Sequence, residues 1–202
     1  MTRLIGLSRA KGLAATITGS RVYLRPPHRR DRDAWIRLRT ISRAFLEPWE
    51  PSWAEDALSK SAYRRRLRRA VQDQDQDLGC AFFIFHRESD ELLGGISLSR
   101  VQRGVAQSCS LGYWIGEPYA RQGYMTEALR GLLTDCFGPL GFHRIEAACL
   151  PDNESSRRLL EKCGFRREGY AHEYLRINGR WHDHLLYALI EKDFRKEDAP
   201  PA

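Results

Sequence analysis

The segment from Tyr113 to Phe137 reads YWIGEPYARQGYMTEALRGLLTDCF. It begins within an aromatic and β-branched run that predicts a strand ending at Ile115, and a turn follows at Gly116 to Pro118. After Gly123 the apolar residues recur at i, i+3, i+4 and i+7, which predicts a helix with one buried face. A strand, a glycine turn and a helix start leave unpaired backbone N–H groups at a positive dipole end, which suits a phosphate group. Alone, the single glycine is equally compatible with an ordinary turn.

The composition indicates which class of protein this chain belongs to. The chain has 202 residues, 42% apolar and 29% charged, which is typical of one globular domain with a real core. No run approaches the roughly 20 apolar residues of a membrane span, and the arginine-containing N-terminus lacks the apolar block of a secretory signal. We therefore expect a cytoplasmic protein with no membrane association, with a partly disordered extension over 1–19, a domain over 20–195 and a flexible tail over 196–202.

The cysteine and histidine patterns do not favour a metal site. Five cysteines, an odd count without CxxC spacing, are typical of small buried hydrophobes in a reducing compartment. His182, Asp183 and His184 invite a metal interpretation with His172, but adjacent strand residues point to opposite faces of a sheet. We expect no metal.

The chain is basic, with a formal net charge of +7 and a pI near 9.4. This favours RNA or a ribonucleoprotein as a neighbour, but a general preference for arginine explains it equally well. Five arginines lie between Tyr63 and Arg69, within a predicted helix that also has an apolar face. A solvated polar face is the favoured interpretation of this run, and a nucleic-acid stripe is the alternative.

Hydrophobic periodicity and turn signals predict the order β-α-α-β-β-β-α-β-α-β-β, a mixed sheet of about seven strands with helices on both faces. The expected strands span 21–25, 80–86, 92–101, 107–115, 143–150, 167–177 and 181–190. The expected helices span 31–44, about 55–72, 124–137 and 153–163. Asn178-Gly179 predicts a type I′ hairpin turn between the last two strands.

The second helix start changes the meaning of the glycine turn. Asn153 has an evident role as the N-cap of its helix. Ser156 lies three and four residues before Leu159 and Leu160, so it belongs to the buried face, where a serine needs a hydrogen-bond partner. A serine facing the strand end beside Gly123 would be well placed to meet a ligand.

With these motifs in order, the chain resembles the GNAT superfamily of N-acetyltransferases, and within it the RimJ/RimL-type ribosomal-protein-alanine N-acetyltransferases. The resemblance covers about Arg21 to Phe194. The matching motifs are Arg25-Pro26, Phe45-Leu-Glu-Pro-Trp-Glu-Pro51, Leu111-Gly-Tyr-Trp-Ile-Gly116, Arg121-Gln-Gly-Tyr-Met-Thr-Glu-Ala128, His143-Arg-Ile-Glu146, Asn153-Glu-Ser-Ser156, Lys162-Cys-Gly-Phe165, Glu168-Gly-Tyr-Ala171 and Asn178-Gly-Arg-Trp-His-Asp-His184. It implies a mixed α/β (α+β) single-domain acetyltransferase fold, mostly antiparallel, with a splayed parallel strand pair that holds acetyl-CoA without a metal.

The resemblance also implies the roles of cofactor residues. Main-chain groups of the strand would bind the acetyl and pantetheine amides, and the residues are Tyr113, Trp114 and Ile115. Backbone N–H groups of the loop would hold the pyrophosphate, from Arg121, Gln122, Gly123, Tyr124, Met125 and Thr126, with Arg121 adding charge. Asn153 would bond a pantetheine amide, and Ser156 would hydrogen-bond the thiolate leaving group and return a proton. Ala120 and Met125 depart from the general superfamily pattern, so the cradle depends more on Gly123 and bare backbone.

The acceptor side is less defined. An N-terminal α-amine has a pKa of about 7.7–8.0, so direct attack on the thioester needs little base, whereas a lysine amine near 10.4 needs much more. Glu50, Glu146 and Glu173 are candidate bases, each with a competing salt-bridge role. Candidate walls of a peptide slot, with core packing as the alternative, are Trp49, Tyr170 and Tyr174.

The sequence therefore predicts an acetyl-CoA-dependent N-acetyltransferase acting on the N-terminal α-amine of a protein, with a ribosomal protein as the implied partner. Two rivals stay open. One is acetylation of a small amine such as an antibiotic or polyamine, and the other is a catalytically weak ribosome- or RNA-binding module on the same fold.

Overall fold

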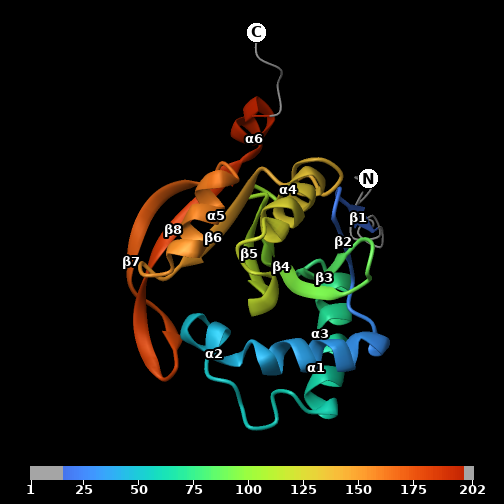
Figure 1. The fold of residues 1–202 in the computed structure, drawn as a ribbon. Helices are drawn as coiled ribbons and strands as arrows, with labels where there is room; N and C mark the ends of the chain where they lie inside the picture. Colours follow the sequence, from blue (N-terminus) through green and yellow to red (C-terminus); the bar gives the residue numbers. More distant parts are fainter. Residues whose placement is uncertain (1–15, 198–202) are drawn as a thin grey trace, which may run out of the picture.

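The computed structural model describes residues 16–197, in which eight strands form one mixed sheet in the order β1-β2-β3-β4-β5-β6-β8-β7 (Figure 1). The strands are β1 (Ile17–Thr18), β2 (Val22–Arg25), β3 (Cys80–His86), β4 (Leu92–Gln102), β5 (Ser108–Ile115), β6 (Arg144–Cys149), β7 (Arg166–Ile177) and β8 (Arg180–Ile190). The α-helices are α1 (Arg32–Ile41), α2 (Arg43–Leu46), α3 (Lys60–Asp75), α4 (Tyr124–Phe137), α5 (Glu154–Lys162) and α6 (Glu191–Glu197). Three short 3₁₀ turns, η2 (Arg29–Asp31), η3 (Glu47–Trp49) and η4 (Glu117–Tyr119), complete the set.

The predicted mixed α/β fold is confirmed, with one strand more than the seven expected. The additional strand β1 pairs antiparallel with β2, within the segment assigned to the N-terminal extension. Residues 1–15 and 198–202 lie outside the described residues. Helix α3 begins at Lys60, not near residue 55, because the Ser59 hydroxyl accepts a hydrogen bond from the Ala62 amide and caps it there.

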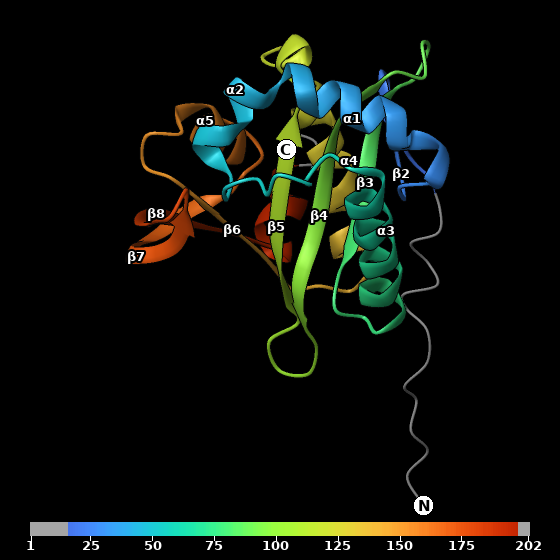
Figure 2. The same cartoon turned by 90° about the horizontal axis from the view of Figure 1, so that it is seen from below.

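Both faces of the sheet are covered by helices (Figure 2). Figure 2 shows α3 in front of β3, with α4 behind β3 and β4. Strand β3 displays the alternation that this requires: Phe82 and Ile84 belong to the core cluster beneath α4, and Phe83 and Phe85 belong to the cluster beneath α1 and α3. The long apolar run in β3 is therefore explained by burial on two sides.

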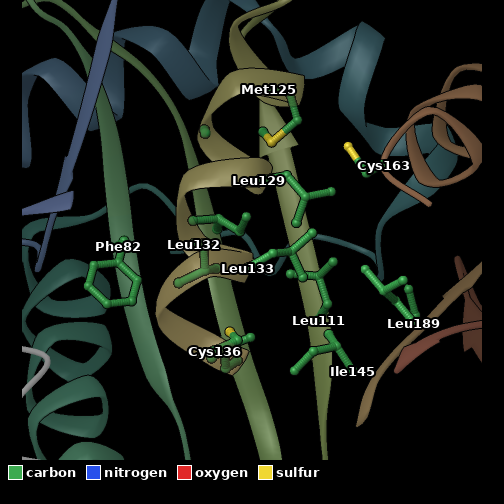
Figure 3. Close-up of a cluster of buried hydrophobic side chains, with 14 of the residues drawn as sticks. Phe82, Leu111, Met125, Leu129, Leu132, Leu133, Cys136, Ile145, Cys163 and Leu189 are labelled. Carbon is green, nitrogen blue, oxygen red and sulfur yellow. The ribbon is translucent and has the colours of Figure 1, made fainter. Parts of the chain in front are cut away.

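Helix α4 supplies the main core (Figure 3). Its apolar side chains at the predicted positions are all buried: Met125, Ala128, Leu129, Leu132, Leu133, Cys136 and Phe137. They pack over Leu111 of β5 and Ile145 of β6 (Figure 3). This packing places the N-terminus of α4 beside the ends of those two strands, where the candidate site lies.

Within residues 16–197 no helix has the length and apolar content needed to cross a bilayer. No disulfide joins the five cysteines, and all five are buried, as expected for small core residues.

Candidate active site

The parallel pair β5–β6 opens partway along its length. The two strands pair at Ser108 with Arg144, Cys109 with Ile145 and Ser110 with Glu146. Beyond these pairs the described strands continue without pairing to each other: β5 follows β4 up to Ile115, and β6 follows β8 up to Cys149. The sheet thus contains an internal edge with main-chain N–H and C=O groups that a ligand can pair with, as an added strand would.

The predicted cofactor strand lies on this internal edge. Tyr113 and Ile115 pack against the core cluster beneath α4, and Trp114 packs against the opposite cluster beneath α1 and α3. Because these side chains point to the two faces of the sheet, the groups that a ligand can reach in the plane of the sheet are main-chain N–H and C=O groups. This geometry fits the expected binding of acetyl and pantetheine amides.

The loop after β5 has a backbone geometry that is compatible with the expected anion cradle. Arg121 has a φ of 61° and Gly123 a φ of 84°, both left-handed, and the second suits glycine. Gly123 provides no side-chain cap, and the first hydrogen bond of this helix turn is donated by Glu127 N to Gly123 O. The amides of Tyr124, Met125 and Thr126 therefore lack intrahelical partners and carry the positive end of the helix dipole.

Arg21 lies beside the proposed cradle, a position that the sequence analysis did not predict. Its guanidinium lies 4.8 Å from the centre of the Tyr124 ring and donates to the Gln122 carbonyl oxygen over 3.2 Å. A Cβ on Gly123 would come within 3.1 Å of an Arg21 nitrogen. The Arg21 guanidinium is therefore next to the loop before α4, although about 100 residues separate the two in the chain.

Glu127 holds Arg21 in this place. Its carboxylate accepts hydrogen bonds from the Arg21 amide at 2.7 Å, from the Ser20 hydroxyl at 3.0 Å and from the Arg21 side chain at 3.1 Å. Burial alone would raise the pKa of Glu127, but these hydrogen bonds outweigh it and lower the pKa. The charged Glu127 carboxylate, in the first turn of α4, is therefore hydrogen-bonded to the residues at the start of β2.

The first turn of α5 faces the strand end. The Asn153 side-chain oxygen accepts the Ser156 amide over 3.0 Å, which confirms the capping interpretation and leaves the side-chain NH₂ to donate to a ligand. Ser156 is buried, and its Oγ lies 2.6 Å from the Tyr113 hydroxyl. The structure thus brings the helix serine and the strand together, as the sequence analysis expected.

Glu50 lies in an ion pair at the acceptor side. Both of its carboxylate oxygens accept hydrogen bonds from the Arg39 guanidinium, one at 2.7 Å, and the Trp53 indole also donates to it over 2.9 Å. The guanidinium stacks on two indoles, 4.1 Å from the Trp53 centre and 5.0 Å from that of Trp114. Because Trp114 belongs to β5, this cluster connects the loop that is expected to meet the acceptor with the strand edge that is expected to bind the acetyl group.

The other two candidate bases differ in their surroundings. Glu146 accepts a hydrogen bond from Arg144 over 2.7 Å and is half exposed. Glu173 sits at an irregularity in β7 with a φ of 45°, and its backbone amide donates to Asp183 Oδ1 over 2.7 Å. Among residues 16–197 the Glu173 carboxylate has no hydrogen-bond or ion-pair partner, so its oxygens are open to a ligand.

Asp183 organises the hairpin around Glu173. Besides the Glu173 amide, its carboxylate contacts His172 Nδ1 at 2.9 Å and accepts a hydrogen bond from the Tyr170 hydroxyl. The Tyr170 bond is the largest cause of a lowered pKa at Asp183, and the same bond raises the pKa of Tyr170. His184 points elsewhere and is buried, and no group of three or more His, Cys, Asp or Glu residues in the described part of the chain is arranged to hold a metal ion.

The candidate acceptor walls remain partly open to solvent. Trp49 is 38% exposed, Tyr170 54% and Tyr174 37%. Tyr174 packs edge-on against His184 at 5.6 Å. These rings are not core residues, so the packing alternative does not account for them.

Comparison with known proteins agrees with this geometry. Residues 21–166 match the family model described as an acetyltransferase (GNAT) domain. The chain is a GNAT-family acetyltransferase. It is 38% identical to the [ribosomal protein uS5]-alanine N-acetyltransferase of Escherichia coli over 88% of this chain and 92% of that protein. It is 34% identical to the probable N-acetyltransferase YjcK of Bacillus subtilis over 88% of this chain and 98% of that one.

The acetyltransferase also resembles solved structures. Mycobacterium smegmatis RimJ in complex with CoA-disulfide superposes with a TM-score of 0.85 at 32% identity, covering 95% of this chain and 92% of that one. Acetyl-CoA is accordingly the co-substrate of this acetyltransferase, and the family chemistry needs no metal. The residues present fit that group, because the open strand edge, the uncapped α4 terminus and Arg21 provide amide partners and positive charge.

Proposed function

We propose that this acetyltransferase modifies the N-terminal α-amine of a protein, and that the acceptor is a ribosomal protein. The amine attacks the acetyl carbonyl directly, and CoA leaves as the thiolate. The names of the relatives support this choice, since the E. coli protein acts on ribosomal protein uS5 and another E. coli relative, 27% identical over 139 residues, is a ribosomal-protein-serine acetyltransferase.

The observation that carries the proposal is the exposed aromatic surface on both acceptor segments. Trp49 stands on the loop after α2, and Tyr170, Tyr174 and Trp181 stand on the β7–β8 hairpin. Large rings exposed in this number need a partner of comparable extent, and a flexible peptide covers such a surface better than a small polyamine does. Figure 1 shows the hairpin extending from the sheet toward α2, so that both segments border the same side.

The chemistry supports an α-amine. At a pKa of about 7.7–8.0 a large fraction of an N-terminal amine is neutral near neutral pH, so the enzyme mainly has to orient it. The internal edge of β5 would hold the thioester. The Gly116 amide donates to Leu93 of the strand on the other side, so by alternation the Trp114 amide also faces β4, and the amides of Tyr113 and Ile115 are the ones that would lie near the developing oxyanion.

The side chains take the following roles in this proposal. Ser156 hydrogen-bonds the sulfur that leaves, and Asn153 binds a pantetheine amide with its free NH₂. Arg121 to Thr126 hold the pyrophosphate. Glu50 and Glu173 are the two carboxylates on the acceptor side that can accept the proton from the amine, Glu50 from within its pair with Arg39 and Glu173 from an open position.

A pair of matched peptides tests the acceptor. One carries a free N-terminal alanine and no lysine, and the other has an acetylated N-terminus and an internal lysine. Thiol release from acetyl-CoA and mass spectrometry should show acetylation of the first peptide and none of the second. Acetylation of the lysine peptide, or of spermidine alone, would contradict the proposal and favour the small-amine rival.

The basic face of α3 does not form the single narrow stripe that an RNA-binding module would present. Arg64, Arg65, Arg66, Arg68 and Arg69 are all exposed. At about 100° per residue they spread over roughly 200° of the helix surface. Arg65 pairs with Asp56 and Arg69 with Asp73, so part of the charge is already matched. RNA binding that weakens steeply with salt would restore this rival.

A further inference from the structure

The Tyr113 hydroxyl and the Ser156 hydroxyl form a short hydrogen bond between the two sides of the open strand pair. Their oxygens lie 2.6 Å apart, although the residues are 43 positions apart in the chain. Tyr113 comes from the part of β5 that has left β6, and Ser156 comes from the first turn of α5. The cofactor strand is therefore connected to the proposed leaving-group residue by a side chain, not only by its main chain.

The surroundings of Ser156 decide where its own proton points. A serine hydroxyl donates one hydrogen bond and accepts two. Either hydroxyl can donate in this bond, and because the phenol is the stronger acid, the favoured direction has Tyr113 donating and Ser156 accepting. The Cys149 sulfur, at the end of β6, also interacts with the Ser156 hydroxyl, and a thiol sulfur is a weak acceptor. With Tyr113 donating to Ser156, the Ser156 O–H is left to donate, and an anionic sulfur entering the open strand pair would be a stronger acceptor for it than the Cys149 thiol.

We infer that Tyr113 is a positioning residue for acetyl transfer: its hydroxyl holds Ser156 so that the serine proton faces the CoA sulfur. This rests on the acetyltransferase activity of the family and on the leaving-group role proposed above for Ser156. A hydroxyl that accepts one hydrogen bond also becomes a stronger donor in the next, because chains of hydrogen bonds polarise one another. Tyr113 thereby strengthens the bond that Ser156 makes to the developing thiolate.

Tyr113 keeps its own proton throughout. Burial raises the pKa of Tyr113 well above its usual range, and the bond to Ser156 only partly opposes this. In the reaction the acceptor nitrogen forms a bond to the acetyl carbon, the carbon–sulfur bond breaks, and its electron pair goes to sulfur. The nitrogen loses one proton and the sulfur gains one, so the overall reaction needs no proton from Tyr113.

The test is a double-mutant cycle on the full-length enzyme with acetyl-CoA and any acceptor amine that gives measurable thiol release. Tyr113→Phe should lower kcat about tenfold and leave the KM for acetyl-CoA within about twofold, since only the hydroxyl is removed. Ser156→Ala should lower kcat about a hundredfold. The double variant should match Ser156→Ala, because Tyr113 has no route to the sulfur once the serine hydroxyl is gone.

A matched control separates this effect from the general loss of a buried hydroxyl. Tyr63 is also buried, and its hydroxyl donates to the His28 carbonyl oxygen over 2.7 Å beneath α3, away from the open strand pair. Tyr63→Phe should lower the melting temperature and leave kcat unchanged.

Three results would overturn the inference. The first is a wild-type kcat in Tyr113→Phe, and the second is a double variant whose fold-loss of kcat is the product of the two single fold-losses. The third is a loss of kcat in Tyr113→Phe when Ser156→Ala has none. The cycle compares rates with one acceptor, so it does not depend on which protein is the natural substrate. Failure of the acceptor proposal appears instead in the peptide pair.

Discussion

Asn178, at the tip of the β7–β8 hairpin, donates a hydrogen bond from its side-chain amide to the Glu47 carbonyl oxygen over 3.0 Å. The Ser52 hydroxyl donates back to Asn178 Oδ1 over 3.1 Å. Two acceptor segments that are 131 residues apart are thus joined at one point. We therefore expect the hairpin and the segment after α2 to form one wall of the proposed acceptor site.

Asn178→Gly should loosen this wall without disturbing the turn. Asn178 has a φ of 48°, which glycine adopts freely, so the type I′ turn persists while both hydrogen bonds are lost. We expect the KM for an acceptor peptide to rise roughly threefold to tenfold, because each bond is worth about 0.5–1.5 kcal/mol. The KM for acetyl-CoA should not change. Ser52→Ala, which removes one bond, should show a smaller rise, and equal peptide KM values for all three proteins would refute the connection.

Arg21→Ala should weaken the binding of the phosphates of CoA. The guanidinium lies beside Gln122 and Tyr124, at the start of α4, where the pyrophosphate is proposed to bind. We expect the KM for acetyl-CoA to rise about threefold to tenfold, as for the loss of one partly exposed charge contact. Acetyl-pantetheine has no phosphate, so its kcat/KM should stay the same.

The fold should survive this change, because the Arg21 backbone amide still donates to Glu127. Arg87→Ala is the matched control, since Arg87 is an exposed arginine whose bond goes to the Gly19 carbonyl oxygen, not to the phosphate loop. An equal loss with both acetyl donors in Arg21→Ala would assign Arg21 to folding and not to phosphate binding.

Local rules were enough for the elements that build the cofactor side. Gly123 before a periodic apolar run predicted α4, and Asn153 predicted the start of α5, because caps and helix faces depend on neighbours within a few residues. The type I′ turn at Asn178-Gly179 followed from the same kind of signal.

Contacts between distant residues were beyond such rules. The Arg21 position, the Tyr113–Ser156 bond and the Arg39–Glu50 pair depend on how elements pack, and nothing in the local pattern ranks one arginine or tyrosine above another. Strand β1 has two residues and exists only because β2 offers it a partner. The predicted start of α3 was early by five residues because residues 55–59 match helix composition while Ser59 sets the cap.

Asp31 should make the free energy of unfolding depend on pH in the acidic range. Its carboxylate is almost fully buried and accepts two hydrogen bonds of 2.7 Å from Arg25 and one of 2.7 Å from the His28 amide. Burial alone would raise the pKa of Asp31, but these bonds lower it below the ordinary value. The carboxylate therefore stabilises the fold fully above about pH 4, and this stabilisation is lost as the pH falls through the lowered pKa.

Urea unfolding between pH 3 and pH 7 measures this contribution. Asp31→Asn should lower the free energy of unfolding by about 3–5 kcal/mol at pH 7, because it leaves Arg25 as a buried unpaired charge. The variant should also have a flatter pH dependence than the wild type. Asp33→Asn, two positions along the chain and exposed, should leave the free energy of unfolding nearly unchanged at pH 7. Parallel pH profiles for wild type and Asp31→Asn would contradict the assignment.

Of the three candidate bases, Glu173 is the one that no arginine side chain holds, whereas Glu50 and Glu146 are both paired with arginine, so we expect Glu173 to receive the proton from the acceptor amine. Glu173→Gln should lower kcat/KM for the peptide about a hundredfold below pH 7, where the amine is mostly protonated. The loss should shrink above about pH 8, because the neutral amine then needs no base to become a nucleophile. Glu50→Gln should instead reduce stability through Arg39, with a loss of rate that does not vary with pH. If the pH-dependent loss appears in Glu50→Gln and not in Glu173→Gln, the base is Glu50, acting from within its ion pair.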